Sequence, residues 1–264
     1  MLKAHRLLLR SEISDEIEAV SNMLFSDTRQ QALTGYRRLA FSGIADAVSL
    51  LYMDNVSKET LQLKHLQDVI DSGTPLVLYD RPCPSLACDQ VVSDDYTGAY
   101  NAVEYLIQTG CKRIMYFSSP MQLEIAHRRY QGWRDALQRY GLWDERTTIR
   151  TCDTREQAII ETPLVMMQDN KPDAIFCVND HCASGVLFAA KTLGIKIPDD
   201  LSICGFANAS LCRTTSPMLT TVEQHGIEIG RRAMQRLLRR LEGDQRIAQT
   251  EMVPTDLIVR ETTK

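Results

Sequence analysis

Apolar runs without polar alternation recur along this chain, and segments of helical period separate them. "PLVLY" and "AIFCV" are such runs, and a strand with this pattern needs cover on both of its faces. Strands of this kind belong to parallel sheets that lie between layers of helices. We expect strands at residues 5–10, 46–53, 74–80, 112–119, 147–152, 173–179, 201–206, 219–222 and 256–260.

The segments between these runs end at glycines. Three helices are expected, at residues 98–109, 181–193 and 225–242, and Gly110, Gly194 and Gly243 follow them directly. Glycine suits this position because it adopts the left-handed conformation that closes a helix. Repetition of strand, helix and strand predicts an α/β fold with right-handed crossovers.

Composition and charge exclude several classes of protein. The net charge of −4 gives no sign of a nucleic-acid-binding surface, and no window approaches a membrane span. None of the eight cysteines forms a C-x-x-C pair or lies near histidines at zinc-finger spacing. We therefore expect no metal and no cofactor. So many cysteines favour a reducing cytoplasm over an exported protein.

Sequence motifs of catalysis are also missing. There is no G-x-G-x-x-G after a strand, no phosphate-binding G-x-x-x-x-G-K-[ST] and no G-x-S-x-G, so we do not expect an enzyme. Asp94 and Asp95 are neighbours that point in different directions, and they are better placed to cap the helix that follows. The basic run 231–240 places its arginines opposite leucines, which is typical of the solvated face of an amphipathic helix.

Three quoted stretches resemble one known family. They are "RRYQGWRDAL" (128–137), "PDDLSICGF" (198–206) and "SPMLTTVEQ" (216–224). In this order and spacing they resemble the effector-sensing core of the lactose-repressor/galactose-repressor (LacI/GalR) family of transcription regulators. The resemblance runs from about residue 44 to the end of the chain.

The resemblance implies a periplasmic-binding-protein-like fold of two doubly wound lobes, with a small effector held between them. Three chain crossings would join the lobes, near Ser119–Pro120, Val222–Gln224 and Arg260–Glu261. The first lobe would comprise residues 1–119 plus 223–259, and the second residues 120–222 plus 260–264. Nothing before residue 5 could form the family's helix-turn-helix or the core's first strand, so we expect a truncated first lobe.

Five residues are candidates for effector binding: Arg129, Asn179, Asn208, Ser118 and Asp95. Arg129 matches the arginine with which the family holds its effector, and a guanidinium can donate two parallel hydrogen bonds. Asn179 matches the asparagine of a V-N-D motif, and Asp180 is expected to cap the next helix. Ligands of open α/β sheets bind beyond the carboxyl ends of strands, where these residues fall.

Ala207 departs from the family pattern. Members that bind sugars commonly have an aspartate there, after Gly205 and Phe206. Without that carboxylate, Arg129 is expected to prefer an anionic group, unless Asp94, Asp95, Asp153 or Asp180 supplies the missing charge.

The function expected from the resemblance is effector sensing for transcription control. The alternative is a solute-binding protein of a transporter, which shares the fold but needs an export signal. We further expect a cytoplasmic homodimer joined mainly through the first lobe. Operator DNA would be bound only through a helix-turn-helix that this chain does not carry.

Overall fold

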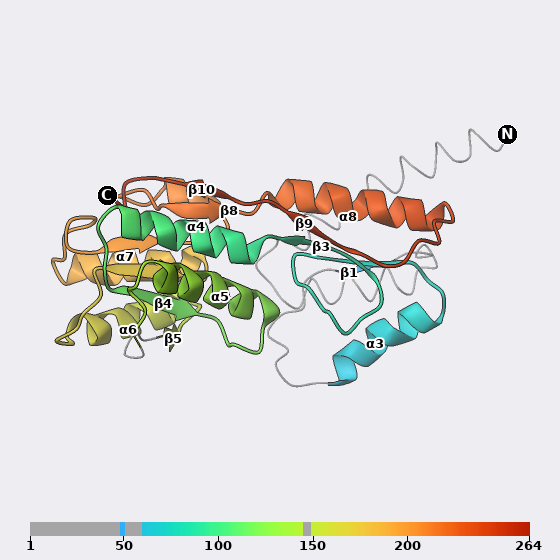
Figure 1. Ribbon diagram of the computed structural model, residues 1–264, viewed down its shortest axis with the longest axis horizontal. Helices are drawn as coiled ribbons and strands as arrows, with labels where there is room; N and C mark the ends of the chain where they lie inside the picture. The colour runs from blue at the N-terminus through green and yellow to red at the C-terminus, as the bar shows by residue number, and fades with distance from the viewer. Residues whose placement is uncertain (1–47, 51–59, 145–148) are drawn as a thin grey trace.

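The computed structural model describes residues 48–50, 60–144 and 149–264, which form two parallel sheets with their helices, placed end to end (Figure 1). The first sheet has the strand order β1-β2-β3-β9 and the second has the order β5-β4-β6-β7. A two-stranded antiparallel ribbon of β8 and β10 lies beside the second sheet. The predicted α/β class with parallel sheets is confirmed, while the strand expected at 5–10 lies outside the described residues.

Helices cover both faces of the first sheet, whose strands are β1 (Val48–Leu50), β2 (Leu76–Tyr79), β3 (Asp89–Ser93) and β9 (Thr250–Val253). Helix α8 (Gly226–Leu241) packs on one face, where it buries Val77. Helix α3 (Thr60–Asp71) packs on the other face, where it buries Leu76 and Leu78. Successive β2 side chains point to opposite faces, so each finds a different helix, as the continuous apolar run predicts.

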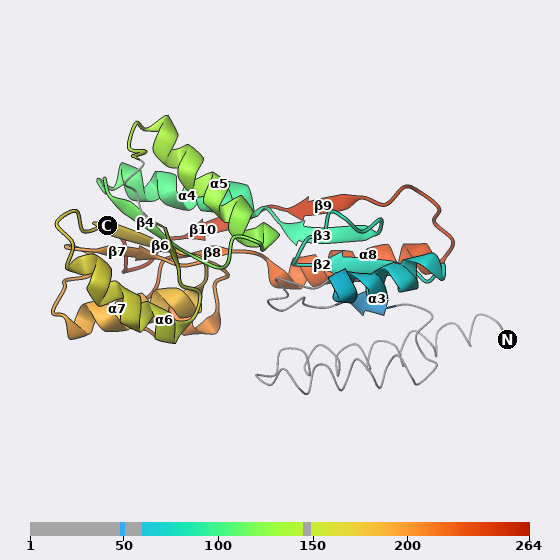
Figure 2. The same ribbon diagram turned by 90° about the horizontal axis from the view of Figure 1, so that it is seen from below.

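The second sheet has the same layered plan, with strands β4 (Ile114–Ser118), β5 (Ile149–Thr151), β6 (Ala174–Cys177) and β7 (Ser202–Cys204). Figure 2 shows α4 (Asp95–Gln108) and α5 (Glu124–Arg139) on one face, and α6 (Arg155–Met166) and α7 (Asp180–Thr192) on the other. Tyr116 and Phe176 face α4 and α5, whereas Phe117 and Ile175 face α6 and α7.

A glycine lets α4 and α5 approach closely. A Cβ added at Gly132 would lie 2.3 Å from the backbone oxygen of Tyr96, closer than any side chain allows. The glycine of the R-R-Y-Q-G motif therefore serves packing between helices. It lies one turn after Arg129, so the same contact turns Arg129 toward the start of α4.

The expected boundary at residues 119–120 is wrong. Strand β4 pairs in parallel with β5 and β6, and it therefore belongs to the second sheet. Helix α4 also packs on that sheet, so the chain passes from the first to the second lobe directly after β3. The sequence could not show this because strand pairing joins segments that are far apart in the chain.

The third expected crossing, at Arg260–Glu261, is likewise wrong. Strand β10 (Asp256–Ile258) already pairs with β8 (Thr221–Glu223). The backbone of Ile203 in β7 donates to the carbonyl of Thr262, 2.8 Å away. The chain thus returns to the second lobe between β9 and β10. Strand β9 was not predicted, because its sequence TEMV has little apolar content, and the crossing just after it was therefore missed.

Helix ends follow the predicted pattern. Gly110, Gly194 and Gly243 follow their helices with φ of 100°, 73° and 96°. Asp94 caps α4 as expected, because its side chain accepts a hydrogen bond from the amide of Thr97. Local chemistry decides these positions, and the sequence was sufficient to find them.

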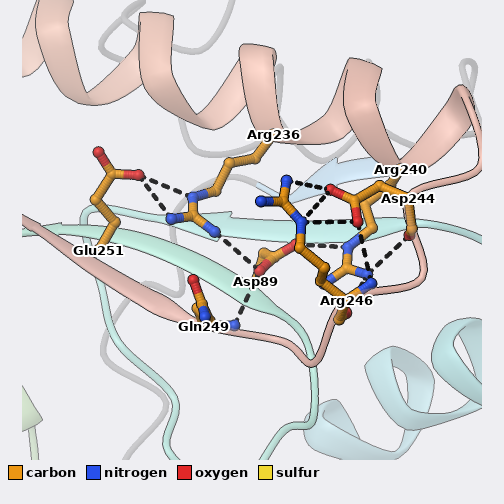
Figure 3. Close-up of polar contacts among 7 residues, drawn as sticks. All are labelled: Asp89, Arg236, Arg240, Asp244, Arg246, Gln249 and Glu251. Carbon is orange, nitrogen blue, oxygen red and sulfur yellow. Dashed lines mark hydrogen bonds and ion pairs between the residues drawn. The ribbon is translucent and has the colours of Figure 1, made fainter.

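Three arginines on the basic face of α8 contact the first sheet, so the prediction that this face is solvated is wrong for them. Arg232, Arg236 and Arg240, which we call the inner arginine row, lie against the edge of the first sheet. Glu251 accepts from the first two, and Asp89 accepts from Arg240 at 2.7 Å (Figure 3). Carboxylates far away in the sequence therefore neutralise this row.

Candidate functional site

The candidate residues lie at the carboxyl ends of parallel strands. Asp95 follows β3, Ser118 ends β4, Asn179 follows β6 and Asn208 follows β7. These are the positions at which open α/β sheets bind ligands. Arg129 comes from the first half of α5 and reaches the same region.

Arg129 and Asp95 form a buried ion pair. The Nε and Nη2 atoms of Arg129 lie 2.8 and 2.6 Å from Oδ1 of Asp95. The arginine side chain is 5% exposed and the carboxylate 0%. Its Nη1 also donates to the carbonyl of Val178, and the guanidinium lies 3.7 Å from the ring centre of Phe206. One side chain thus links α5, α4, β6 and the segment after β7.

The ion pair bears on the expectation that Arg129, without a nearby carboxylate, prefers an anionic ligand. We expected Ala207 to leave Arg129 without compensation unless a nearby carboxylate supplied the charge, and Asp95 supplies it at contact distance. Burial raises the pKa of Asp95, and the guanidinium of Arg129 opposes that rise and keeps the carboxylate as its counter-ion. The exception stated for that expectation therefore applies, with Asp95 as the residue that supplies the charge.

Two buried polar atoms next to this pair have no hydrogen-bond partner among the described residues. They are Oδ2 of Asp95 and the phenol oxygen of Tyr116. Burial raises the pKa of Tyr116, so its hydroxyl stays protonated and is able to donate. Buried polar groups are usually paired, so these two mark a place where a water or a ligand would complete the site.

Asn179 serves first as a helix cap. Its backbone is extended, its Oδ1 accepts from the amide of Cys182 at 2.8 Å, and its Nδ2 donates to the carbonyl of Asp153 at 2.8 Å. The prediction that Asp180 caps α7 is wrong, because the residue before the helix has the extended geometry that a cap needs.

Asp180 instead holds the segment after β7. It is 1% exposed, and its Oδ2 accepts from the amide of Ala209 at 2.7 Å while its Oδ1 accepts from the hydroxyl of Thr221. Burial raises the pKa of Asp180, and these hydrogen bonds oppose that rise. A Cβ at Gly205 would lie 2.2 Å from Oδ1, so the glycine of the G-F motif makes room for this carboxylate.

Asn208 turns away from Arg129 and toward the ribbon of β8 and β10. Its Nδ2 donates to Glu223 at 2.6 Å, and its Oδ1 accepts from Arg260 at 2.7 Å. The sequence analysis missed both partners. The only signal was that each is a charged residue directly beside an apolar strand, in "TTVEQ" and "LIVRE".

The side chain of Ser118 makes local hydrogen bonds only. It is fully buried, and its hydroxyl donates to the carbonyl of Ser119 at 2.7 Å. Of the five candidates, the structure therefore brings Arg129 and Asp95 into contact, while Ser118, Asn179 and Asn208 bond to other groups. Phe206 and the carbonyl of Val178 complete the site, and residue patterns could not show a backbone acceptor.

The described part of the chain has neither a helix long and apolar enough to cross a membrane nor a group of three residues suited to a metal ion. All eight cysteines are free, and seven of them are buried.

Two parallel-sheet lobes with repeated chain crossings, and polar residues at the strand ends between them, define the class of periplasmic-binding-protein-like sensor domains. The sequence model of the Periplasmic binding protein-like domain family matches residues 103–263. The chain belongs to this family and, within it, to the LacI/GalR group of transcription regulators.

Known proteins of this group are similar over most of the chain. The HTH-type transcriptional repressor CytR of Escherichia coli K12 is 36% identical over 191 residues, which is 72% of this chain and 56% of CytR. The chain therefore spans about half the length of this relative. A LacI-family regulatory protein from Chloroflexus aggregans is 29% identical with a TM-score of 0.75, covering 91% of this chain and 84% of that one.

A complex of the transcriptional regulator CelR with cellobiose is also similar. It is 25% identical with a TM-score of 0.74, and the match covers 87% of this chain and 70% of CelR.

Proposed function

We propose that this chain is the effector-sensing part of a transcriptional repressor. A small molecule binds at the carboxyl ends of the strands, beside Arg129 and Asp95, and changes the arrangement of the two lobes. That change controls DNA binding by the helix-turn-helix of the whole regulator. The relatives CytR and PurR are transcriptional repressors and DegA is a transcriptional regulator, which favours this function over that of a solute-binding protein for a transporter.

The observation that carries the proposal is the buried contact between Arg129 and Asp95. Asp95 follows β3 after one residue, at the point where the chain leaves the first lobe. Arg129 connects it to β6 and to Phe206 in the second lobe. A ligand that bonds to either side chain in one lobe arrangement and not in the other shifts the equilibrium between them.

We propose a neutral, hydroxyl-bearing ligand of sugar type. The positive charge of Arg129 is already compensated, and the unpaired Oδ2 of Asp95 accepts hydrogen bonds without donating. The aromatic ring of Phe206 offers an apolar surface next to these polar groups. The cellobiose complex of CelR supports this ligand class, since that relative binds a neutral sugar.

The remaining properties follow from the resemblance. We propose a homodimer in the cytoplasm that has no enzymatic activity and binds operator DNA only as part of the full regulator. Eight free cysteines suit a reducing compartment. Sedimentation of the protein at micromolar concentration tests the oligomer, and stable monomer alone would contradict it.

Calorimetric titration tests the ligand proposal. The probes are ribose, cellobiose, glucuronate and glucose 6-phosphate, titrated into the wild type, Asp95→Asn and Phe206→Leu. We expect a neutral sugar to bind the wild type and to bind both variants at least tenfold more weakly. Arg139→Ala, an exposed arginine at the far end of α5, is the control and should bind as the wild type does.

A far-ultraviolet spectrum and a melting curve show whether each variant is folded. Phe206→Leu retains the ion pair, so it tests the site even if Asp95→Asn unfolds. Glucuronate or glucose 6-phosphate that binds more tightly than both sugars, and more weakly to Phe206→Leu than to the wild type, would contradict the neutral ligand class. Binding of any probe that neither variant weakens would contradict the site.

A further inference from the structure

Helix α8 carries a second row of polar residues outside the inner arginine row. Arg231, Gln235 and Arg239 are spaced by four residues, so they share one face of the helix, and all three are exposed. This outer row faces away from the sheet that the inner row contacts. It has no role in the proposed effector site around Arg129 and Asp95.

The two rows border a hollow of about 260 Å³ on the surface of the first lobe. It is lined by Glu228, Arg231, Arg232, Gln235, Arg236, Arg239 and Glu251. Four arginines against two glutamates leave an excess of two positive charges. The chain as a whole has a net charge of −4, so this excess is a local feature of α8.

The inner row has little bonding capacity left. Figure 3 shows Arg236 between Glu251 and Asp89, and Arg240 on the other oxygen of Asp89. The Nε and Nη2 atoms of Arg236 lie 2.9 and 2.8 Å from Glu251. These bonds hold the floor of the hollow rigid, so a ligand would meet preformed geometry.

In the outer row, Arg231 is paired with Glu228, and Gln235 and Arg239 offer free donors. Arg239 makes no hydrogen bond or ion pair with any residue that the structure describes, and neither does Gln235. Arg239 also lines a second, smaller hollow that contains Arg246 and Asp244. A guanidinium with its donors unused, set between two arginine-lined hollows, is an unfilled site for an acceptor.

We propose that this hollow on α8 binds a phosphate group, with Arg239 as its principal donor and Gln235 beside it. Its volume is below the roughly 300–1,000 Å³ of pockets for drug-sized ligands, so it suits one small group. A phosphate monoester carries about −1.5 to −2 charges and three acceptor oxygens, which matches the local excess of charge and the forked donors.

The phosphate comes either from a free anion or from a phosphorylated side chain. Both have the same chemistry at the hollow. The titration therefore uses inorganic phosphate and a short phosphoserine peptide, with the unphosphorylated peptide and sodium chloride at equal ionic strength as controls. The anion that binds more tightly identifies the source, and either result supports the site.

Arg239→Ala tests the assignment, and Arg139→Ala is its matched control. Both arginines are exposed and both stand in the last turn of a helix of 16 residues, but Arg139 lies in the second lobe. We expect Arg239→Ala to weaken phosphate binding at least tenfold, the loss that one charge-assisted hydrogen bond represents. Arg139→Ala should leave phosphate binding unchanged, and Arg239→Lys should retain part of it.

Three results would overturn the proposal. The first is that the wild type does not bind phosphate at millimolar concentration. The second is that Arg139→Ala and Arg239→Ala weaken phosphate binding equally. The third is that sodium chloride at equal ionic strength abolishes phosphate binding by itself. Phe206→Leu, which changes the effector site, should bind phosphate as the wild type does. The site on α8 and the proposed effector site can therefore fail independently.

Discussion

Arg129 directs two nitrogen atoms, Nε at 2.8 Å and Nη2 at 2.6 Å, to a single oxygen of Asp95, and the second oxygen of that carboxylate has no hydrogen-bond partner in the described part of the chain. A symmetric forked pair would use both oxygens. The offset arrangement satisfies the charge of the arginine while it leaves one acceptor free. The charges of Arg129 and Asp95 therefore neutralise each other, and the free oxygen of Asp95 is still able to accept a hydrogen bond from a neutral ligand.

The first prediction concerns the stability that this pair provides. Asp95→Asn leaves the guanidinium of Arg129 buried without a counter-ion, so it should lower the free energy of unfolding by about 3–5 kcal/mol. Glu124→Gln breaks the half-buried pair of Glu124 with Arg128 on the protein surface and should cost less than about 1 kcal/mol. Urea unfolding at pH 7 measures both, and equal losses would show that burial of the pair is unimportant.

The second prediction concerns the backbone at Ala207. Its φ of 109° is rarely adopted by residues with a side chain, so Ala207→Gly should raise the free energy of unfolding by about 1 kcal/mol. Ala209, two residues later, has a φ of −57° and is the matched control. Ala209→Gly should lower stability by about 0.5–1 kcal/mol, because glycine adds entropy to the unfolded chain. Chemical denaturation of both variants would contradict the argument if the two changes had the same sign.

The third prediction concerns the close contact of α4 and α5. Gly132→Ala places a Cβ against the backbone oxygen of Tyr96, and it should cost about 1–3 kcal/mol and weaken effector binding by moving Arg129 from Asp95. Gly230 lies inside α8 with no atom within 4 Å of an added Cβ. Gly230→Ala should therefore stabilise the protein by up to about 1 kcal/mol. Thermal melts of both variants measure the contrast, and a stable Gly132→Ala variant would show that the helices can separate freely.

The fourth prediction concerns pH. Burial alone would raise the pKa of Asp89, but hydrogen bonds from Arg240 and from the amide of Gln249 lower it below its ordinary value. The unfolded chain then binds the proton more readily than the folded one, so the stability from Asp89 is present above a pH of about 4 and is lost as the pH falls through the lower, folded pKa.

Asp89→Asn removes this pH dependence. It should cost about 2–3 kcal/mol at pH 7, since Arg236 and Arg240 lose an ionised partner, and the difference from the wild type should shrink as the pH falls from 5 to 3. Unfolding of both proteins in urea at several pH values measures this difference in the free energy of unfolding. A difference that is constant or grows in acid would contradict the lowered pKa.

Much of the secondary structure could be predicted because its causes are local. The all-apolar runs at β2 and β6, the glycines after α4, α7 and α8, and the cap at Asp94 each depend on a few neighbouring residues. Strand β3 was missed because it begins with two polar residues, Asp89 and Gln90, which are buried. Arg236 and Arg240 of α8 and the amide of Gln249 supply the partners of Asp89. The side chain of Gln90 bonds to the backbone of Cys83.

The sequence by itself determined the layered α/β class, the helix ends and the membership of a regulator family, since periodicity, capping and motifs are properties of short segments. Only the tertiary structure decided that β4 belongs to the second sheet, that Asp95 neutralises Arg129, and that Asp89 and Glu251 neutralise the inner arginine row. Each of these joins residues at least fifteen positions apart. Strand pairing and charge pairing over such separations depend on which surfaces pack together, and one-dimensional patterns do not record that.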